Sequence, residues 1–399
     1  MEQKNLKNIR IAIIGPSGAG KTTLIDLLFI VFKNMHFAIS DTTKKIPVGH
    51  VNGQEYNYIS TEKFSQKKQN NLYAEYNDQF NDWYGTPLSE TDITDNSVIF
   101  NVDVDGARNL KKIFPDLVTI FIKPPSVQEL ERRLLIRARE SEEKIRLRIR
   151  RYRYEKKFIP YFDYCLTNDD LDGCFAKLAA IIFKEQGGII TAIDGTAASG
   201  KGTIAKELAQ MFDAYHLDSG LIYRNITYAM INEGITYDDE NLGQYLSRFL
   251  ETFSGIEDEK LLRTEEISAK VANFSSLKEV RRIAFQLQMK MAYHFGHYHI
   301  IAEGRDMTTF VFSEAQYKFF VDCPLGIRAE RRAKQFGYLK NSGDYWNIYN
   351  ALECRDKADM DRKLHPLKFC PRLGVKKINN IKYLEKTIEK TMSFYIKVA

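Results

Sequence analysis

The sequence predicts an α/β protein with two domains, each a parallel sheet flanked by helices. Three observations carry this prediction: a length of 399 residues, two glycine-rich loops of the same spacing, and short apolar runs that alternate with helical patterns. This length suggests two or three domains, and alternating strands and helices are typical of a parallel sheet covered on both faces. Near 183–188 a helical pattern ends in polar residues and two glycines. We therefore expect one domain over 1–185 and a second over 186–399.

Both loops fit the pattern G-x-x-x-x-G-K, follow an apolar run and precede a helix-like stretch. Their glycines let backbone N–H groups turn toward phosphate oxygens, and the helix dipole favours the anion. The lysine of such a loop reaches the β- and γ-phosphates, and a threonine hydroxyl can contact Mg²⁺. The second loop has Gly202 where Ser or Thr is usual, with Thr203 one place later. We expect two ATP sites with Mg²⁺ near Thr22 and Thr203.

The ATP-binding residues expected in the first loop are Gly15, Ser17, Gly18, Gly20, Lys21, Thr22 and Thr23. Those expected in the second are Gly195, Thr196, Ala197, Ala198, Ser199, Gly200, Lys201, Gly202 and Thr203.

The composition favours small anionic ligands. The net charge of +6 is modest and suits anionic ligands in general. Five cysteines show no C-x-x-C spacing, which indicates free or buried thiols in a reducing compartment. No apolar run approaches about 18 residues, and the first residues lack a signal-peptide core. We expect a soluble, cytoplasmic protein that binds small-molecule nucleotides and neither a membrane nor nucleic acid.

Apolar runs and helical patterns alternate along the first half. The expected strands are Ile9–Ile14, Val98–Val102, Leu117–Ile122 and Asp163–Leu166. The expected helices lie near Thr22–Phe32, Ala107–Ile113, Val127–Leu135 and Glu143–Lys157. Ligands of such sheets bind beyond the carboxyl ends of the strands.

The loop at 15–22 resembles that of guanylate kinases almost letter for letter, as do the stretches 114–126 and 129–134. The resemblance covers about residues 8 to 183 and implies a P-loop nucleoside monophosphate kinase domain, with NMP-binding and lid subdomains, that phosphorylates GMP. Guanine presents N1–H and N2–H₂ donors, so its pocket needs acceptors. The resemblance assigns base reading to Glu75, Thr86 and Asp103. It assigns phosphate binding to Ser40, Lys44, Tyr56 and Tyr84.

Three positions depart from the guanylate kinase pattern. Where the family has two phosphate-clamping arginines, this chain has Lys44 and Pro47, and Asn101 replaces the first Asp of D-x-D. Lysine keeps the charge of arginine but loses its bidentate fork, and proline has no charge. The alternative is therefore a guanylate-kinase-like module that binds or regulates without catalysis.

The segment 132–157 is strongly basic. A charge run of this kind is typical of a solvated helix face, and most of these arginines are expected on the surface. The resemblance places Arg137 and Arg148 where the family's lid clamps the transferring phosphoryl group.

The second half resembles cytidylate kinases over about residues 189 to 395. The blocks that carry the resemblance are 216–224, 302–309, 355–362 and 366–368, together with Lys278 to Arg281. Thr308 stands where the family has glycine, and 328–332 is expected at the lid. Asp194, at the end of the strand before the loop, is a candidate to orient Mg²⁺ waters.

Cytosine presents an N4–H₂ donor beside two acceptors, so its reader must mix hydroxyl, carboxylate and guanidinium groups. The resemblance implies that Ser219, Arg281 and Asp306 read the base. It places Arg224, Arg305 and Arg362 on the acceptor phosphate, Asp359 at the sugar and Arg355 beside the transferring group. Tyr223 belongs to the same CMP-binding set.

Both resemblances imply transfer of the ATP γ-phosphate to a nucleoside monophosphate: GMP in the first domain, CMP and dCMP in the second. The protein must position the substrates and neutralise charge on the equatorial oxygens, the task of Lys21, Lys201 and the lid arginines. A GTPase would need an N/T-K-x-D guanine reader, and 167–170 lacks the lysine. An ABC-type ATPase would need a signature helix and a strand ending in D-E, neither of which is evident.

Overall fold

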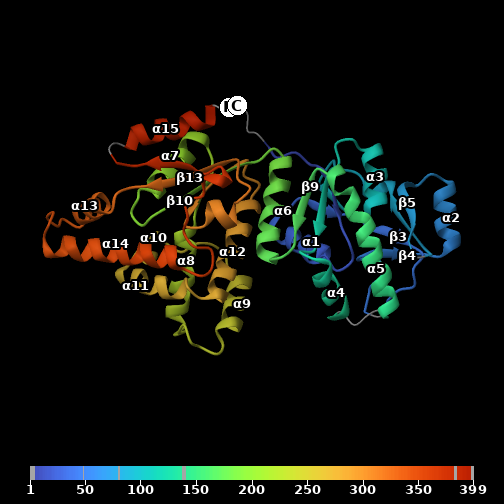
Figure 1. Ribbon diagram of the computed structural model, residues 1–399, viewed down its shortest axis with the longest axis horizontal. Coiled ribbons are helices and arrows are strands. Elements are labelled where there is room, and N and C mark those ends of the chain that lie inside the picture. The colour runs from blue at the N-terminus through green and yellow to red at the C-terminus, as the bar shows by residue number, and fades with distance from the viewer. Residues whose placement is uncertain (1–4, 48, 80, 137–140, 382–383, 397–399) are drawn as a thin grey trace. The chain divides into compact units, whose positions relative to one another are not determined.

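The computed structural model describes residues 5–47, 49–79, 81–136, 141–381 and 384–396. The chain forms two compact units, Leu6–Leu178 and Ala179–Ala399, each described here by itself (Figure 1). None of the described helices is both long enough and apolar enough to cross a membrane.

The first unit is built on a parallel five-stranded sheet of order β2-β7-β1-β8-β9. Its strands are β1 (Arg10–Ile14), β2 (Met35–Phe37), β7 (Ser97–Val102), β8 (Val118–Lys123) and β9 (Tyr164–Thr167). Its helices are α1 (Lys21–Val31), α2 (Thr61–Gln69), α3 (Val104–Ile113), α4 (Val127–Ile136), α5 (Glu142–Glu155) and α6 (Leu171–Glu185).

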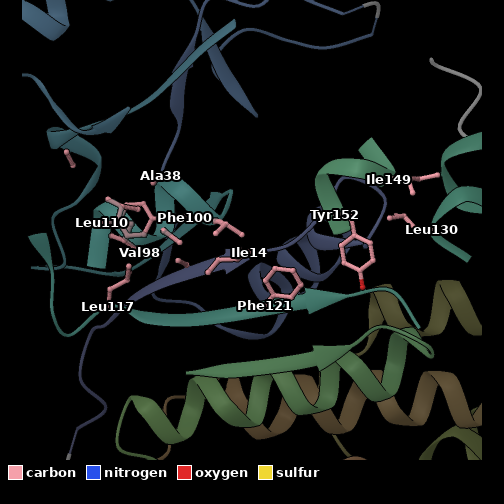
Figure 2. Packing of buried hydrophobic residues seen from close by; sticks show 14 of the residues in the cluster. Ile14, Ala38, Val98, Phe100, Leu110, Leu117, Phe121, Leu130, Ile149 and Tyr152 are labelled. Atoms are coloured by element: carbon pink, nitrogen blue, oxygen red, sulfur yellow. The ribbon is translucent and has the colours of Figure 1, made fainter. Parts of the chain in front are cut away.

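Alternation along the strands separates the two faces of this sheet. Ile14 and Phe121 face a core to which α3, α4 and α5 contribute Leu110, Leu130 and Tyr152. Figure 2 shows Tyr152 of α5 beside Phe121 of β8. This burial is the main stabilising contribution to the unit.

A second, four-stranded sheet of order β4-β3-β6-β5 extends the first unit. Its strands are β3 (Ser40–Thr42), β4 (Tyr56–Tyr58), β5 (Tyr73–Gln79) and β6 (Asp82–Pro87). None of these four strands was predicted from the sequence. For β3 and β4 the reason is their length of three residues, which is too short for a measurable periodicity.

The second unit repeats the five-stranded parallel sheet, with order β11-β12-β10-β13-β14. Its strands are β10 (Ile189–Gly195), β11 (Tyr215–Asp218), β12 (His299–Gly304), β13 (Tyr317–Asp322) and β14 (Lys376–Asn379). Its helices are α7 (Lys201–Phe212), α8 (Ser219–Asn232), α9 (Leu242–Thr252), α10 (Glu259–Leu262), α11 (Glu265–Phe274), α12 (Lys278–Tyr293), α13 (Leu325–Gln335), α14 (Gly343–Asp361) and α15 (Leu384–Ile396). Ile193, Phe319 and Leu208 are buried in one core beside this sheet.

The predicted fold class, parallel sheets flanked by helices in two domains, is confirmed. In the first half all four predicted strands and four predicted helices exist, with ends that differ by a few residues. The largest difference is α3, which begins at Val104 because the side chain of Asp103 caps it by accepting from the Gly106 N–H. The predicted boundary at 185/186 stays a prediction. The contact division between 178 and 179 lies inside α6.

Candidate active site

In each unit the central strand leads directly into the phosphate-binding loop. The first loop joins β1 to α1, and the second joins β10 to α7. Both loops therefore lie at the carboxyl end of the central strand, where parallel sheets bind ligands. Both helices begin at the loop lysine, so their unpaired N–H groups and positive dipole ends belong to the loops.

In the first loop, the lysine side chain folds back onto the backbone of the loop itself. Lys21 Nζ donates to the carbonyl oxygens of Gly15 at 2.6 Å and Pro16 at 3.2 Å. The side chains of Thr22 and Thr23 are exposed. The lysine is thus held over the cradle, with hydroxyl groups accessible beside it.

Three of the predicted GMP-binding residues form a hydrogen-bonded row. The Thr86 hydroxyl donates to Glu75 Oε1 at 2.7 Å and lies 3.4 Å from Ser40 Oγ. All three residues are buried. Burial raises the pKa of Glu75 to about 7, with a further increase from Asp103 and a partial decrease from the Thr86 hydrogen bond. A carboxylate that is costly to ionise without a partner is suited to a ligand that brings hydrogen-bond donors.

Asp103 lies in a network that sequence reasoning did not find. Its Oδ1 accepts from Asn77 Nδ2 and from the Gly106 N–H, both at 2.8 Å. Its Oδ2 lies 3.1 Å from Arg151, which also contacts Asp105 at 2.7 Å and Glu155 at 3.1 Å. Arg151 was predicted to be a surface charge of the basic segment. That expectation is wrong, because the arginine bridges carboxylates of α3 and α5.

The expected phosphate-binding side of this site contains the aromatic hydroxyl groups of Tyr56 and Tyr84. Tyr56 and Tyr84 pack edge to face at 5.6 Å between ring centroids. Burial raises the pKa of Tyr84 and the charge of Arg148 opposes that rise, which places Arg148 in the electrostatic surroundings of Tyr84. Lys44 is exposed. Arg137 lies outside the described residues.

The second loop holds its lysine against a carboxylate. Lys201 Nζ lies 3.7 Å from Glu303 Oε2, and His216 Nε2 lies 3.8 Å from Glu303 Oε1. Burial lowers the pKa of Lys201 and raises that of Glu303. A Cβ on Gly202 would lie 2.5 Å from Glu303 Oε1. A side chain at position 202, where Ser or Thr is usual, would therefore require the Glu303 carboxylate to shift. The next residue, Thr203, is exposed.

Sequence reasoning quoted Glu303 only as part of a matching block and gave it no role. The register β10–β12, which pairs Ile193 with Glu303, places the carboxylate beside the loop.

The predicted CMP-binding residues form an ion-pair network. Arg281 contacts Asp306, and Arg362 lies 3.8 Å from the same carboxylate. Asp359 lies 3.1 Å from Arg305 and 3.7 Å from Arg362. Residues from α12, the end of β12 and α14 are brought together in this way. Charges that are already paired need little reorganisation when an anionic substrate binds.

The remaining CMP residues surround this network on different sides. The Tyr223 ring lies 5.8 Å from the guanidinium carbon of Arg281, and burial raises the tyrosine pKa to about 12. Ser219 is buried at the start of α8. Arg224 donates to Leu262 O at 3.1 Å and Ser268 Oγ at 2.9 Å, so it faces α10 and α11. Arg355 is exposed and has Arg305 and Asp359 among its charged neighbours.

Two expectations for the second unit are wrong. Asp194 is fully buried, and its carboxylate accepts from the backbone of Met307 and Thr308 and from the Thr308 hydroxyl at 2.6 Å. It therefore fixes the loop after β12 and is not available to Mg²⁺ waters.

The second error concerns Arg328, which was expected at the lid. It is buried, contacts Asp356 at 2.6 Å and donates to the Ala197 carbonyl at 2.8 Å. Asp356 Oδ1 accepts from the Ala197 N–H at 3.0 Å. This ion pair holds the middle of the second phosphate loop.

The residues present fit ATP and Mg²⁺. Each cradle combines a helix N-terminus, a lysine and an exposed threonine hydroxyl. Among the described residues, the buried Oγ of Ser199 and Oγ1 of Thr196 in the second cradle have no hydrogen-bond partner.

Comparisons with known proteins agree with this division. A family model described as guanylate kinase matches residues 7–185, and one described as cytidylate kinase matches residues 191–386. The guanylate kinase of Rickettsia conorii is 36% identical over 182 residues, which cover 45% of this chain and 80% of that protein. The guanylate kinase of Prochlorococcus marinus is 37% identical over 182 residues, which cover 45% of this chain and 98% of that protein.

Proposed function

We propose that this chain is a bifunctional enzyme, because it belongs to the guanylate kinase family over residues 7–185 and to the cytidylate kinase family over residues 191–386. The two families make it a fused nucleoside monophosphate kinase. The proposed reactions transfer the ATP γ-phosphate to GMP in the domain 1–185 and to CMP or dCMP in the domain 186–399. The observation that carries the proposal is that each unit has its own phosphate loop and its own buried carboxyl group, Glu75 or Asp306, to which we assign base reading.

On the donor side, each loop would bind ATP through its backbone N–H groups. Lys21 and Lys201 would follow the γ-phosphoryl group during transfer. Bound Mg²⁺ would neutralise charge on the β- and γ-phosphates, and Thr22 and Thr203 are the residues proposed to contact it. The acceptor phosphate is itself the nucleophile, so no separate general base is required.

On the GMP side, ionised Glu75 and Asp103 would accept from the guanine N1–H and N2–H₂ groups, with Thr86 beside them. Ser40, Lys44, Tyr56 and Tyr84 would bind the acceptor phosphate, and Arg148, with Arg137, would stabilise the migrating charge. The 2.7 Å hydrogen bond from Thr86 supports this assignment because it orients the Glu75 carboxylate.

On the CMP side, Asp306 would accept from the cytosine N4–H₂ group, while Arg281 and Ser219 would donate to the base. Arg224, Arg305 and Arg362 would hold the acceptor phosphate, Asp359 the sugar and Arg355 the transferring group. The pairing of Arg281 with Asp306 supports a mixed donor and acceptor surface. Tyr223 would pack beside it.

A second candidate function for the first domain is a binding module without turnover. Lys44 is exposed, and Pro47 and Asn101 replace charged residues of the family pattern. The intact phosphate loop favours catalysis, whereas these three positions favour binding alone.

The test is an ADP-release assay of the full chain with GMP, CMP, dCMP, UMP and AMP as acceptors. We expect turnover with GMP, CMP and dCMP. Absence of CMP and dCMP turnover would overturn the second-domain assignment. Turnover with CMP but not GMP, together with GMP binding in calorimetry of a Lys201→Ala chain, would identify the first domain as a binding module.

A further inference from the structure

Each unit places an asparagine against its phosphate loop at the end of its last parallel strand. Asn168 follows β9, and its Nδ2 donates to the Ala19 carbonyl at 2.8 Å. Asn380 follows β14, and its Nδ2 donates to the Ser199 carbonyl at 2.8 Å. Both asparagines are buried, so each side-chain hydrogen bond is shielded from water.

The loop residue after each of these carbonyl groups is a glycine, which leaves room for the asparagine amide. Gly20 and Gly200 have φ angles of 92° and 86°, in the left-handed region. A Cβ on either glycine would lie 2.3 Å from the Nδ2 atom of its asparagine. The second-to-last residue of the motif must therefore be glycine for two independent reasons: its conformation and the close approach of the asparagine.

The backbone of each asparagine is anchored in the same way. The Asn168 N–H donates to Lys123 O at 2.9 Å, and the Asn380 N–H donates to Asp322 O at 2.8 Å, both at the end of the neighbouring strand. Arg133 of α4 donates to Asn168 O at 3.0 Å. Arg331 of α13 donates to Ile381 O, one residue beyond Asn380, at 3.3 Å. The repetition of these contacts in two units of different sequence indicates a common purpose.

We propose that Asn168 and Asn380 are positioning residues for phosphoryl transfer, which aim one backbone N–H of each loop at the bound phosphates. In a planar trans peptide the C=O and N–H groups point in opposite directions. An asparagine that holds the carbonyl of Ala19 or Ser199 therefore turns the N–H of Gly20 or Gly200 to the opposite side, into the cradle. The inference rests on the proposed function for its substrates, and on the structure alone for the hydrogen bond.

The test is made in the full chain with Asn380→Asp, which keeps the shape of the side chain and removes the Nδ2 donor. The matched control is Asn379→Asp, the same chemical change at the exposed neighbouring residue. We expect Asn380→Asp to lower kcat/KM for ATP in the CMP reaction by about 10- to 100-fold, the effect of leaving a buried polar group unpaired. KM for CMP and the GMP reaction should stay within about twofold.

Asn168→Asp should give the mirror-image result, loss in the GMP reaction alone. Asn380→Ala removes the donor without adding a charge, and it keeps the test decisive if Asn380→Asp does not fold.

A pH profile separates positioning from mere stability. In Asn380→Asp a protonated carboxyl group can donate to the Ser199 carbonyl, whereas the ionised group cannot. Relative to the unaltered chain, the ATP defect should therefore diminish as pH falls from about 8 to about 5, because burial raises a carboxyl pKa. A role limited to stability predicts a lower melting temperature with unchanged KM for ATP, and that result would overturn the proposal.

Failure of the proposed function gives a different result. If the unaltered chain phosphorylates no nucleoside monophosphate, the proposed function fails. MgADP binding measured by calorimetry then tests the asparagine. Weakening of one MgADP site by Asn380→Asp but not by Asn379→Asp supports the inference, and equal binding in both variants contradicts it.

Discussion

The residues proposed to bind the acceptors hold charge in different ways in the two domains. In the second domain, arginine and aspartate side chains pair with one another, as Arg305 does with Asp359 at 3.1 Å. In the first domain, the expected phosphate-binding side has the hydroxyl groups of Tyr56 and Tyr84 and the exposed cation of Lys44. The phosphate loops, by contrast, share the same strand–loop–helix arrangement, although Lys21 contacts loop carbonyl groups and Lys201 lies against Glu303. The arrangement of the phosphate loop is thus common to the two domains, and the residues proposed to bind the acceptors are where they differ.

The difference has a physical consequence for each reaction. A network of paired charges is preorganised, so little energy is spent on orienting it when the substrate binds. Tyrosine hydroxyl groups offer a phosphate neutral hydrogen bonds, which are weaker than charge-assisted ones. We expect the second domain to bind its acceptor more tightly than the first.

The largest expected effect separates the two loops. Lys201→Ala should reduce CMP phosphorylation by at least about 10³-fold, because the transition-state charge loses a buried cation. GMP phosphorylation should stay within about twofold, and Lys21→Ala should give the reverse pattern. Steady-state rates of both reactions on the same preparations provide the measurement. Loss of both activities in one variant would show that the two sites are not independent.

The second prediction concerns base selection in the paired-charge site. UMP offers a carbonyl where CMP offers the N4–H₂ group, so Asp306 would face an acceptor. Mispaired polar groups cost about 1–3 kcal/mol each, and we expect kcat/KM for UMP to be lower than for CMP by about 10- to 100-fold. Equal values for the two nucleotides would refute the assigned base readers.

The third prediction tests whether Lys44 and Pro47, in place of the two arginines of the family pattern, weaken GMP binding by the first domain. The double variant Lys44→Arg with Pro47→Arg should lower KM for GMP by about tenfold or more, since one charge-assisted contact is worth about 1.5–3 kcal/mol. The CMP reaction should not change. Pro47→Ala is the control, because it relaxes the backbone without adding charge. An equal gain from Pro47→Ala would identify the backbone as the defect.

The smallest predicted effect is a pH dependence of the first domain. Burial raises the pKa of Glu75 to about 7, so guanine donors meet an ionised carboxylate more often as pH rises. KM for GMP should fall by about tenfold between pH 6 and pH 8. Glu75→Gln should weaken GMP binding and remove this dependence, and an unchanged profile in that variant would contradict the assignment.

Glu75 should also make the stability of the folded protein depend on pH. Stability should fall as pH rises, whereas GMP binding should strengthen. The folded pKa of Glu75 lies above the unfolded value, so the native state binds more protons between about pH 4.5 and pH 7. The contribution of Glu75 to stability is therefore present below about pH 4.5 and is lost as pH rises through 7. Thermal unfolding of Glu75→Gln and the unaltered chain across this range measures the difference.

Four strands and four helices of the first half, and both families, could be predicted from the sequence, and both resemblances are confirmed. The short strands β3 and β4 could not be predicted, because three residues contain too little pattern. The role of Arg151 could not either, since its partner Asp103 lies 48 positions away. The individual site assignments stay predictions until the variants are measured.

The sequence by itself determined the two donor loops. Their glycines, lysines and following helices are neighbours in the chain, so a local pattern of residues is enough to identify each cradle. Only the tertiary structure decided what surrounds each cradle. Glu303 reaches Gly202 because β12 pairs with β10 in register, and Asn380 reaches Ser199 across 181 positions because β14 is the last strand of the same sheet. Strand order and register bring such distant side chains together, and no local pattern of residues predicts either of them.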